Sequence, residues 1–387
     1  MLIVRRQLKA GVGRRTDGHS TTNSSRKENV LKRNILFVTT VCSCAFLLLS
    51  VAGQQGEKGR SSWPKPSQTP NSNRLSGATS GSAIVEDYPT GPVRVIEPFG
   101  AGGGVDVLAR PVARKLSELW GQSVTVENHP GAGATAAPTL VAKSQPDGYT
   151  LLVSSSAQAY SAVFAKNLPY DPLNDFIPIA PLTSQPYVLV AGQSAGISNV
   201  QGLISAAKAK PGQLKFGFAG IGTGSHLAVQ KFNLAVGIKG MGVSPGPSDA
   251  IGDVIAHVVA GDTAYMIAPI PMALPHIREG RLRALGVSGA RRSPLLPEVP
   301  TIAEAGVHGF NFPIWYGVWA PAGTPAPVVD KLAKDIARVL ATPDLREWFA
   351  SHGAEPMRMT QAEFARFVRS ESESAAQIIK AAGINPQ

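Results

Sequence analysis

The segment Pro98–Arg110 places four glycines directly after an apolar run, Val93–Pro98, that predicts a buried strand. A helical pattern with one apolar stripe follows, from Val107 to Leu119. A glycine-rich turn between a strand and a helix exposes backbone N–H groups beside the positive end of the helix dipole. The segment therefore predicts an anion site for a phosphate or a carboxylate. The alternative is a tight turn that binds nothing.

A second glycine-rich turn, GIGTGSHLA at 220–228, also precedes a helical pattern, and a third loop, ENHPGAGAT, covers 127–135. None of the three matches the dinucleotide fingerprint G-x-G-x-x-G or the P-loop, and no lysine follows the glycines. None of the three turns contains the G-x-S-x-G elbow of the α/β-hydrolases. These patterns disfavour nucleotide chemistry and serine hydrolysis at the glycine turns.

Several polar side chains accompany the turns, and each allows two interpretations. Asp106 falls in the first helical turn, where the helix dipole alone favours a carboxylate, or it contacts a polar ligand. His226 follows Ser225 directly, which favours a capping or packing role over a catalytic pair. The hydroxyls of 154–156 and Thr223 lie at strand ends, where they either cap the backbone or bind a ligand.

Charge and metal-ligand patterns exclude other classes of function. The chain carries a formal charge of +11, but residues 1–34 hold nine Lys or Arg against Asp17 and Glu28, so only +4 remains beyond them. No basic stripe is left for nucleic acid. The seven histidines lack H-x-x-x-H spacing, and both cysteines lie in the apolar run 35–52. We therefore expect no metal, no cofactor and no disulfide.

The N-terminal region resembles an export signal. The apolar run 35–52 follows Lys32 and Arg33 and ends in small residues, so residues 1–52 are interpreted as a signal peptide cleaved after Ala52. A retained membrane anchor is the alternative, and a translation start near Val30 is a further hypothesis for the long basic part. Residues 53–87 are rich in Ser, Gly, Pro and Gln and predict a disordered linker.

From residue 88 onward strand and helix patterns alternate, which predicts an α/β fold with mostly parallel sheets covered by helices. Two successive α/β units predict two lobes with a ligand cleft between them, one glycine turn in each lobe. Half of the aromatic segment 310–319 is expected in the core and the rest at the cleft or a hinge. The expected strands are 93–98, 123–127, 150–154, 187–191, 215–219, 263–268 and 282–287, and the expected helices are 105–120, 135–144, 200–209, 249–259, 271–279, 325–341 and 360–381.

About 300 residues, from Tyr88 to the C-terminus, resemble the solute-binding proteins of tripartite tricarboxylate transporters, the Bug or TctC-like family. The resemblance rests on PFGAGGGVDVLAR, VENHPGAGAT, PDGYTLL, LPYDPLNDFIPIAPL, GIGTGSHLA, the segment 274–306 and WYGVWAPAGTP, in this order. It implies a two-lobed, type II periplasmic-binding-protein fold. Lobe 1 would comprise 88–186 and 310–387, and lobe 2 would comprise 187–309.

The resemblance also implies a function. The protein would be a periplasmic, non-enzymatic receptor that captures a small organic carboxylate and delivers it to membrane permease subunits. A dicarboxylate or tricarboxylate, an aromatic acid or an acidic amino acid would be the ligand, and we expect a monomer that binds no nucleic acid. A sensor protein for a signalling system is the alternative, and a secreted enzyme using the same cleft is a weaker one. The implied ligand-binding residues are Phe99, Gly102, Gly103, Asp106, Ser155, Ser156, Gly222, Thr223, Ser225 and His226.

Overall fold

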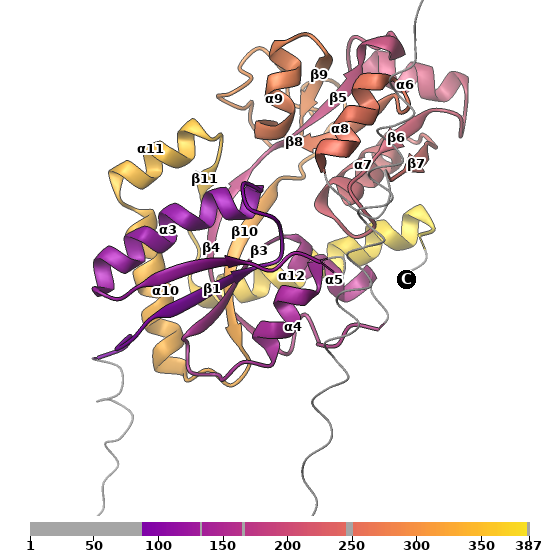
Figure 1. Cartoon of the computed structure of the whole chain (residues 1–387). Coiled ribbons are helices and arrows are strands. Elements are labelled where there is room, and N and C mark those ends of the chain that lie inside the picture. The colour runs from indigo at the N-terminus through magenta and orange to yellow at the C-terminus, as the bar shows by residue number, and fades with distance from the viewer. Residues whose placement is uncertain (1–86, 132–133, 165–166, 245–250, 385–387) are drawn as a thin grey trace, which may run out of the picture. The chain divides into compact units, whose positions relative to one another are not determined.

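The computed structural model describes residues 87–131, 134–164, 167–244 and 251–384, and its elements form two sheets with helices packed on them (Figure 1). The predicted signal peptide, the alternative anchor, the alternative start and the linker, except for its last residue Asp87, lie outside the described residues. Within the described residues no helix is long and apolar enough to span a bilayer.

The first sheet has six strands in the order β11-β4-β10-β3-β1-β2. β1 pairs with β2 and β3 in parallel, whereas β10 runs antiparallel to both β3 and β4. Its strands are β1 (Val93–Glu97), β2 (Val124–Asn128), β3 (Thr150–Ser155), β4 (Phe176–Gln185), β10 (Ile314–Pro321) and β11 (Glu355–Pro356). The helices next to these strands in the chain are α3 (Gly104–Trp120), α4 (Ala136–Ala142), α5 (Ala157–Phe164), α10 (Ala326–Leu340), α11 (Pro343–Ser351) and α12 (Gln361–Ala382).

The second sheet has five strands in the order β7-β6-β8-β5-β9. β6 pairs in parallel with β7 and β8, and β5 runs antiparallel to β8 and β9. Its strands are β5 (Tyr187–Gly192), β6 (Lys215–Gly217), β7 (Met241–Val243), β8 (Tyr265–Pro269) and β9 (Leu282–Val287). They alternate with α6 (Val200–Ala209), α7 (Gly224–Ala235), α8 (Ile251–Ala260) and α9 (Ile270–Arg278), and the short 3₁₀ turn η2 (Gln193–Ala195) follows β5.

The chain passes between the sheets twice, and Ser288 joins the two passages. The first passage runs from β4 through Pro186 into β5, and the second runs from β9 towards β10. The buried Ser288 hydroxyl accepts a hydrogen bond from the Tyr187 N–H (2.9 Å) and donates one to the Phe312 carbonyl (2.7 Å). The two passages are therefore held side by side. The predicted lobe limits 186/187 and 309/310 stay predictions.

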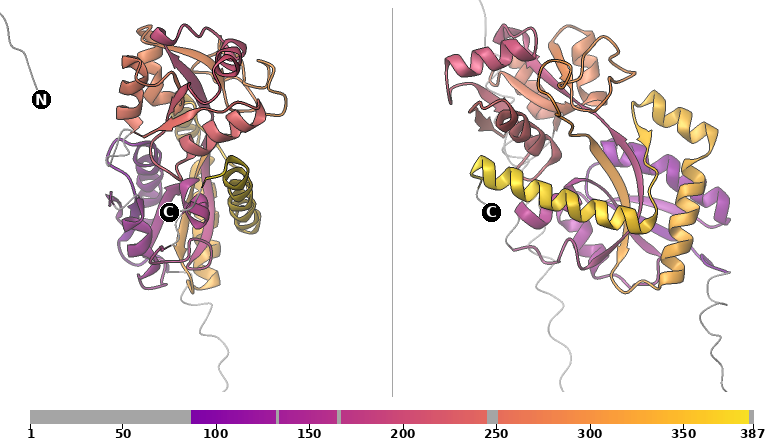
Figure 2. Two further views of the ribbon diagram at one scale, coloured as in Figure 1. Left: turned by 90° about the vertical axis from the view of Figure 1, so that its right-hand side faces the viewer. Right: turned by 180° about the vertical axis from the view of Figure 1, so that it is seen from behind.

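The long helix α12 packs against β4 and α5 of the first sheet and against α7 of the second (Figure 2). Thr360 starts it with a capping box, in which the Thr360 and Glu363 side chains bond each other's backbone N–H groups. Phe364 on this helix is fully buried, with its ring centroid 5.8 Å from that of Trp315 and 5.7 Å from that of Trp319. These aromatic residues fix α12 on the sheet.

The structure corrects the sequence-based expectation in two respects. The prediction of mostly parallel sheets was wrong. In the first sheet β10, β4 and β11 make antiparallel pairs, and in the second β5 does. Alternation along a sequence does not reveal strand direction when a strand leaves one sheet and returns later. The prediction also missed β4, α5 and α11, which are short or interrupted by Pro178 and Pro181.

Replacing Phe364 by alanine should lower the free energy of unfolding by about 3–5 kcal/mol, because a buried aromatic ring leaves a cavity that the surrounding residues fill poorly. Urea denaturation followed by tryptophan fluorescence measures the change. Phe367 is the matched control, since it is partly buried and contacts Trp315 from the same helix. Phe367→Ala should cost clearly less, and an equal cost would show that Phe364 does not anchor α12.

Candidate anion-binding site

Helix α3 begins without a side-chain cap. Its N-cap residue is Gly103, which has no side-chain acceptor to offer. Among the described residues nothing accepts from the N–H groups of Gly104, Val105 and Asp106. The N-terminus of a helix with free N–H groups attracts an anion. The first turn of α3 therefore presents three neutral donors and the positive end of a 17-residue helix.

Three N–H groups of the glycine turn before α3 already have acceptors within the protein. The Phe99 N–H donates to Glu97 Oε2 (2.9 Å), the Gly102 N–H donates to Asp106 Oδ2 (3.0 Å), and the Gly103 N–H donates to the Gly100 carbonyl (3.0 Å). Gly102 has a φ of +80°, which glycine adopts without strain. The donors that remain for a ligand therefore lie at residues 104–106 rather than at Gly102 and Gly103.

Asp106 braces this turn from the helix side. Its carboxylate is 4% exposed as a residue and accepts hydrogen bonds from the Gly102 N–H (3.0 Å), Arg110 Nε (3.0 Å) and Asn128 Nδ2 (2.9 Å). Burial alone would raise the pKa of Asp106, but the bonds from Arg110, Gly102 and Asn128 outweigh it and lower the pKa. Asp106 is thus an ionised structural group, with its oxygens engaged within the protein.

Tyr316 on β10 closes the first turn from the sheet side. A Cβ on Gly104 would lie 2.8 Å from the Tyr316 hydroxyl oxygen, so the helix can start here only with glycine. That hydroxyl accepts a hydrogen bond from Gln185 Nε2 (3.0 Å). Tyr316 is buried, and burial raises its pKa above the usual tyrosine range, so it stays protonated and can donate.

The second glycine turn caps α7 through hydroxyl groups. The Thr223 hydroxyl accepts from the His226 N–H (3.4 Å), donates to the Gly220 carbonyl (3.0 Å) and lies 3.1 Å from the Ser225 hydroxyl. The Ser225 hydroxyl also accepts from the Ala219 N–H (3.4 Å). This capping is worth about 1 kcal/mol, and at the start of α7 it leaves the N–H groups of Gly224 and Ser225 without an acceptor in the described part of the chain.

His226 is a buried packing residue. Its ring stacks on Phe218 with centroids 4.3 Å apart, and its Nδ1 accepts a long bond from the Gly222 N–H (3.5 Å). Burial lowers the pKa of His226 to about 4, so the ring is neutral at physiological pH. Gly222 itself must stay small, because a Cβ there would lie 3.1 Å from the Phe164 ring.

Tyr187 is the polar group that sequence reasoning missed. It is the first residue of β5, is 2% exposed, and no described residue forms a hydrogen bond with its hydroxyl. The hydroxyl faces Gly224, where any Cβ would collide with it, and the Ser156 hydroxyl lies 3.6 Å from the same Cβ position. Burial and the nearby Tyr316 raise the pKa of Tyr187. The Tyr187 hydroxyl therefore lies at the start of α7, where it can donate to a ligand.

The predicted serines lie at the end of β3 in this same area. The Ser155 hydroxyl accepts from the Ala157 N–H (3.3 Å), and the Ser156 N–H donates to the Trp315 carbonyl (2.8 Å). Ser155 is also the antiparallel partner of Tyr316.

The structure thus brings the ten predicted residues into two groups. Among the described residues no hydrogen bond joins the group of the first turn to the group of the second turn. The Tyr316 hydroxyl lies against Gly104 at the start of α3, and the Tyr187 hydroxyl lies against Gly224 at the start of α7. Glu97 and Asn128 also went unpredicted. Among the residues missed at the site, only Tyr316 had a signal in the sequence, its place in the aromatic run. The type of a strand residue does not show which face of the sheet its side chain points to.

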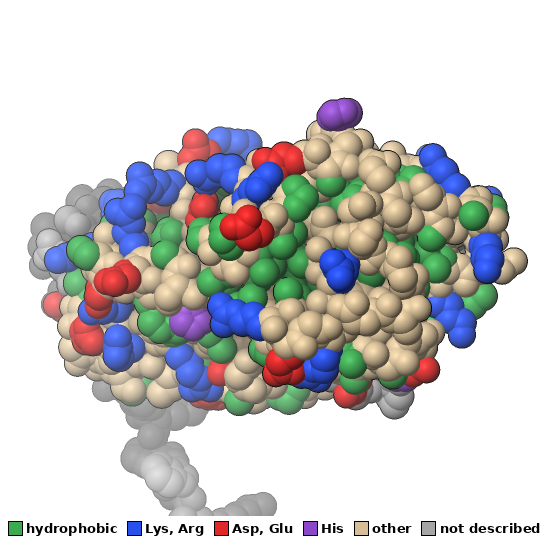
Figure 3. Space-filling model, turned by 90° about the horizontal axis from the view of Figure 1, so that it is seen from above, with side chains coloured by type: hydrophobic (Ala, Val, Ile, Leu, Met, Phe, Trp, Pro, Cys, Tyr) green, Lys and Arg blue, Asp and Glu red, His purple; other side chains and the backbone are tan. Residues whose placement is uncertain are grey.

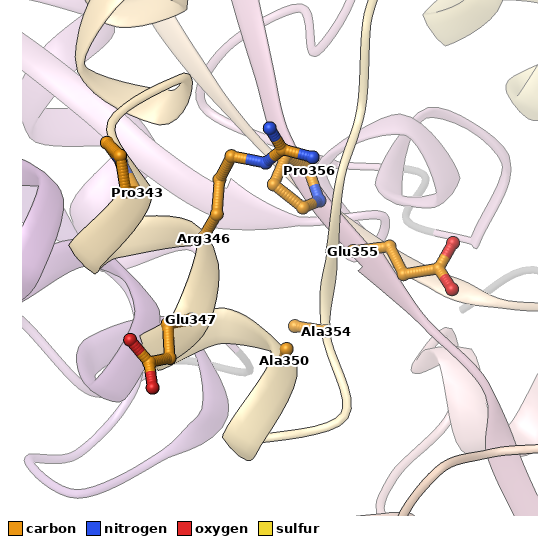
Figure 4. A pocket seen from close by; sticks show the side chains of 7 residues that line it. All are labelled: Pro343, Arg346, Glu347, Ala350, Ala354, Glu355 and Pro356. Atoms are coloured by element: carbon orange, nitrogen blue, oxygen red, sulfur yellow. The ribbon is translucent and has the colours of Figure 1, made fainter.

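The described residues also contain hollows away from the glycine turns. One of about 400 Å³ lies between α11 and β11, where the side chains of Arg346, Glu347 and Glu355 point in different directions (Figure 4). Another of about 420 Å³ lies between α3 and α11, beside Arg114 and Trp348. No group of three or more potential metal ligands occurs in the described part of the chain. On the face in Figure 3, Lys and Arg alternate with Asp and Glu rather than forming a basic stripe.

A family model for the tripartite tricarboxylate transporter family receptor matches residues 108–384. The chain belongs to this family. A curated member, BugT of Bordetella pertussis, is 36% identical over 312 residues, which cover 79% of this chain and 94% of BugT. The family assignment by resemblance in the sequence is therefore confirmed.

Solved structures similar to this chain share the fold. Rpa4515 of R. palustris, solved with adipate, aligns with a TM-score of 0.71 and 32% identity over 78% of this chain and all of its own. The periplasmic binding protein BugD aligns with a TM-score of 0.68 and 32% identity over 78% of this chain and all of its own. MatC of Rhodopseudomonas palustris, solved with malate, aligns with a TM-score of 0.66 and 33% identity over 76% of this chain and all of its own. The two-lobed periplasmic-binding fold is confirmed.

Asp106→Asn should lower the free energy of unfolding at pH 7 by about 1.5–3 kcal/mol, because it weakens hydrogen bonds to a buried charged group. The folded-state pKa of Asp106 is depressed, so its contribution is present above the unfolded value of 3.8 and is lost as the pH falls. Urea denaturation at pH 7 and pH 3 should show the difference between variant and wild type shrinking at pH 3.

Glu127→Gln is the matched control for this experiment. Glu127 makes an exposed two-point ion pair with Arg94 at 2.8 Å and 2.7 Å, and such surface pairs contribute about 1 kcal/mol or less. If Asp106→Asn destabilised the protein no more than Glu127→Gln at pH 7, Asp106 would not be the brace of the glycine turn.

Proposed function

We propose that this receptor binds a carboxylate group of a small organic acid between the N-terminus of α3, the N-terminus of α7 and the Tyr187 hydroxyl. The observation that supports it most is the combination of the uncapped start of α3 with the Tyr187 hydroxyl, which bonds no described residue and lies against Gly224 at the start of α7. A carboxylate oxygen supplies the acceptors that these groups need.

The donors at the site carry no charge, which favours a carboxylate over a phosphate. The turns 98–104 and 220–226 contain no Lys or Arg, and Arg110 is engaged with Asp106. A helix N-terminus stabilises an anion by about 0.3–1 kcal/mol, and by about 2 kcal/mol when partly buried. Two such ends with a hydroxyl suit a single carboxylate, whereas a phosphate with two charges usually needs a fixed cation as well.

The relatives support the ligand class. Rpa4515 was solved with adipate and MatC with malate, which are both dicarboxylates. We propose that this chain takes a ligand from the same broad group of dicarboxylates and tricarboxylates, aromatic acids and acidic amino acids. Phe99, Gly102, Gly103 and Asp106 would form and brace one wall of the site. Ser155, Ser156, Gly222, Thr223, Ser225 and His226 would form the other.

A receptor without catalysis fits the chemistry of these groups. The Ser225 hydroxyl bonds within its own turn, and the neutral His226 ring pairs with the Gly222 N–H rather than with a serine. Nothing here forms the nucleophile and base pair of a hydrolase. We propose that the protein is exported by the leader 1–52, acts as a monomer in the periplasm, and delivers its ligand to permease subunits.

Purified protein should bind at least one acid from a panel of adipate, malate, citrate, benzoate and glutamate. At a ligand concentration one hundred times Kd, binding should raise the free energy of unfolding by about 2.7 kcal/mol. Thermal unfolding with each acid, followed by calorimetric titration of those that shift Tm, measures this. Methylphosphonate and the methyl ester of each binding acid serve as controls, and a panel without any shift would overturn the proposal.

Uptake of the binding acid separates transport from sensing. Cells that lack the gene should lose uptake of the labelled acid and regain it with the wild-type gene. Retained uptake together with a lost transcriptional response would favour the sensor alternative.

Tyr187→Phe should weaken binding of that acid by about 10- to 150-fold, since a hydrogen bond to a charged group is worth about 1.5–3 kcal/mol. The variant should not lose stability, because the hydroxyl bonds no described residue. Calorimetric titration and urea denaturation give the two readouts.

Tyr265→Phe is the matched control. Tyr265 is another buried tyrosine of the second sheet, and its hydroxyl donates to Asn233 Oδ1 (2.8 Å). This variant should lose stability but keep its affinity. If Tyr187→Phe behaved like Tyr265→Phe, the Tyr187 hydroxyl would be a structural group and not a ligand contact.

A further inference from the structure

Glu97 lies directly beneath the first glycine turn and has no role in the site as described. It is the last residue of β1 and is completely buried. One carboxyl oxygen accepts from the Phe99 N–H (2.9 Å), and the other accepts from the Asn128 side-chain amide. A buried carboxyl group in this position holds the entry of the turn, but it also brings a titratable charge next to an anion site.

Asn128 connects Glu97 with Asp106. Its Nδ2 donates to both Glu97 Oε1 and Asp106 Oδ1, and its Oδ1 accepts from Arg110 Nη2 (2.8 Å). Two buried carboxyl groups therefore share one amide and face one guanidinium. Arg110 forms an ion pair with Asp106 (2.7 Å). Its positive charge therefore offsets mainly the charge of Asp106 and offsets little of the charge of Glu97.

The remaining neighbours of Glu97 add no second compensating charge. Glu127 on β2 pairs with His129 just after the strand (3.5 Å) and with Arg94. Helix α4 and strand β3, which also lie against β1, contain no charged residue. Burial, reinforced by Asp106 and opposed by the bonds from Phe99 and Asn128, raises the pKa of Glu97 to about 7.

We propose that Glu97 is a positioning residue that couples binding of the ligand carboxylate to the uptake of one proton. This inference rests on the proposed function, because it requires an anion at the N–H groups of residues 104–106. A carboxylate there adds a third negative charge to Glu97 and Asp106, against Arg110 alone. Protonation of the Glu97 carboxyl removes one of these charges.

The direction of the pH effect follows from linkage. A bound anion raises the pKa of Glu97 above its value of about 7 in the free protein. Below both values the group is protonated in both states, and affinity does not depend on pH. Between them, each pH unit weakens binding by up to tenfold, because one proton is taken up per ligand bound. Above both values the affinity is constant and low.

The experiment is calorimetric titration between pH 6 and 9 with the panel acid that binds, chosen so that it is fully ionised across this range. Each titration is repeated in two buffers of different ionisation enthalpy, which counts the protons taken up by the wild-type protein. We expect net proton uptake above pH 7 and a Kd that rises with pH. Uptake near zero with a constant Kd would overturn the inference, and this readout needs no variant.

Two variants assign the proton to its residue. Glu97→Gln imitates the protonated side chain, so its Kd should match that of wild type at pH 6, stay constant to pH 9 and show no proton uptake. His129→Gln is the matched control and should keep the wild-type pH profile. If His129→Gln removed the pH dependence and Glu97→Gln retained it, the coupling would not belong to Glu97.

A third variant separates positioning from plain charge. Glu97→Ala removes the acceptor of the Phe99 N–H and should weaken binding at every pH, whereas Glu97→Gln keeps an acceptor oxygen. Absence of binding by any acid would overturn the proposed function together with this inference. Binding with a pH-independent Kd would overturn the inference alone.

Discussion

The first turn of an α-helix has N–H groups without partners inside the helix, and α3 leaves its own without a side-chain cap. This requirement organises the surrounding structure. Gly104 must lack a Cβ because the Tyr316 hydroxyl lies against it, and Gly102 must adopt a positive φ to lead the chain into the helix. The glycines thus shape the start of α3 so that an outside acceptor can approach, rather than supplying most of the donors themselves.

The carboxyl groups beneath this turn create an opposing effect. Asp106 and Glu97 fix the turn by accepting its inner N–H groups, which divides the donors into a structural set and an open set. The same carboxyl groups repel an incoming anion. Arg110 offsets this repulsion for Asp106, while Glu97 has no cation of its own. The strength of anion binding here depends on that balance of charge as much as on the helix dipole.

Two tyrosines give the two helix ends a similar environment. Tyr316 on β10 faces the start of α3, and Tyr187 on β5 faces the start of α7. Both lie close to the passages of the chain between the sheets, where Ser288 holds the neighbouring backbones together. Their difference is chemical: Tyr316 already has Gln185 as a partner, whereas Tyr187 has none among the described residues. The Tyr187 hydroxyl therefore gains more from a ligand acceptor than the Tyr316 hydroxyl does.

The sequence by itself determined the α/β class, the two glycine turns before helices and the family, because glycine spacing and apolar periodicity are local properties of the chain. Only the tertiary structure decided which donors are open. Asp106 is fully engaged because Asn128 and Arg110 converge on it, and no spacing in the sequence shows this convergence. Strand direction, the positions of Tyr187 and Tyr316, and the burial of Glu97 likewise depend on contacts between residues far apart in the chain. Burial and hydrogen-bond partners set the charge of a side chain, and both arise only when the chain is folded.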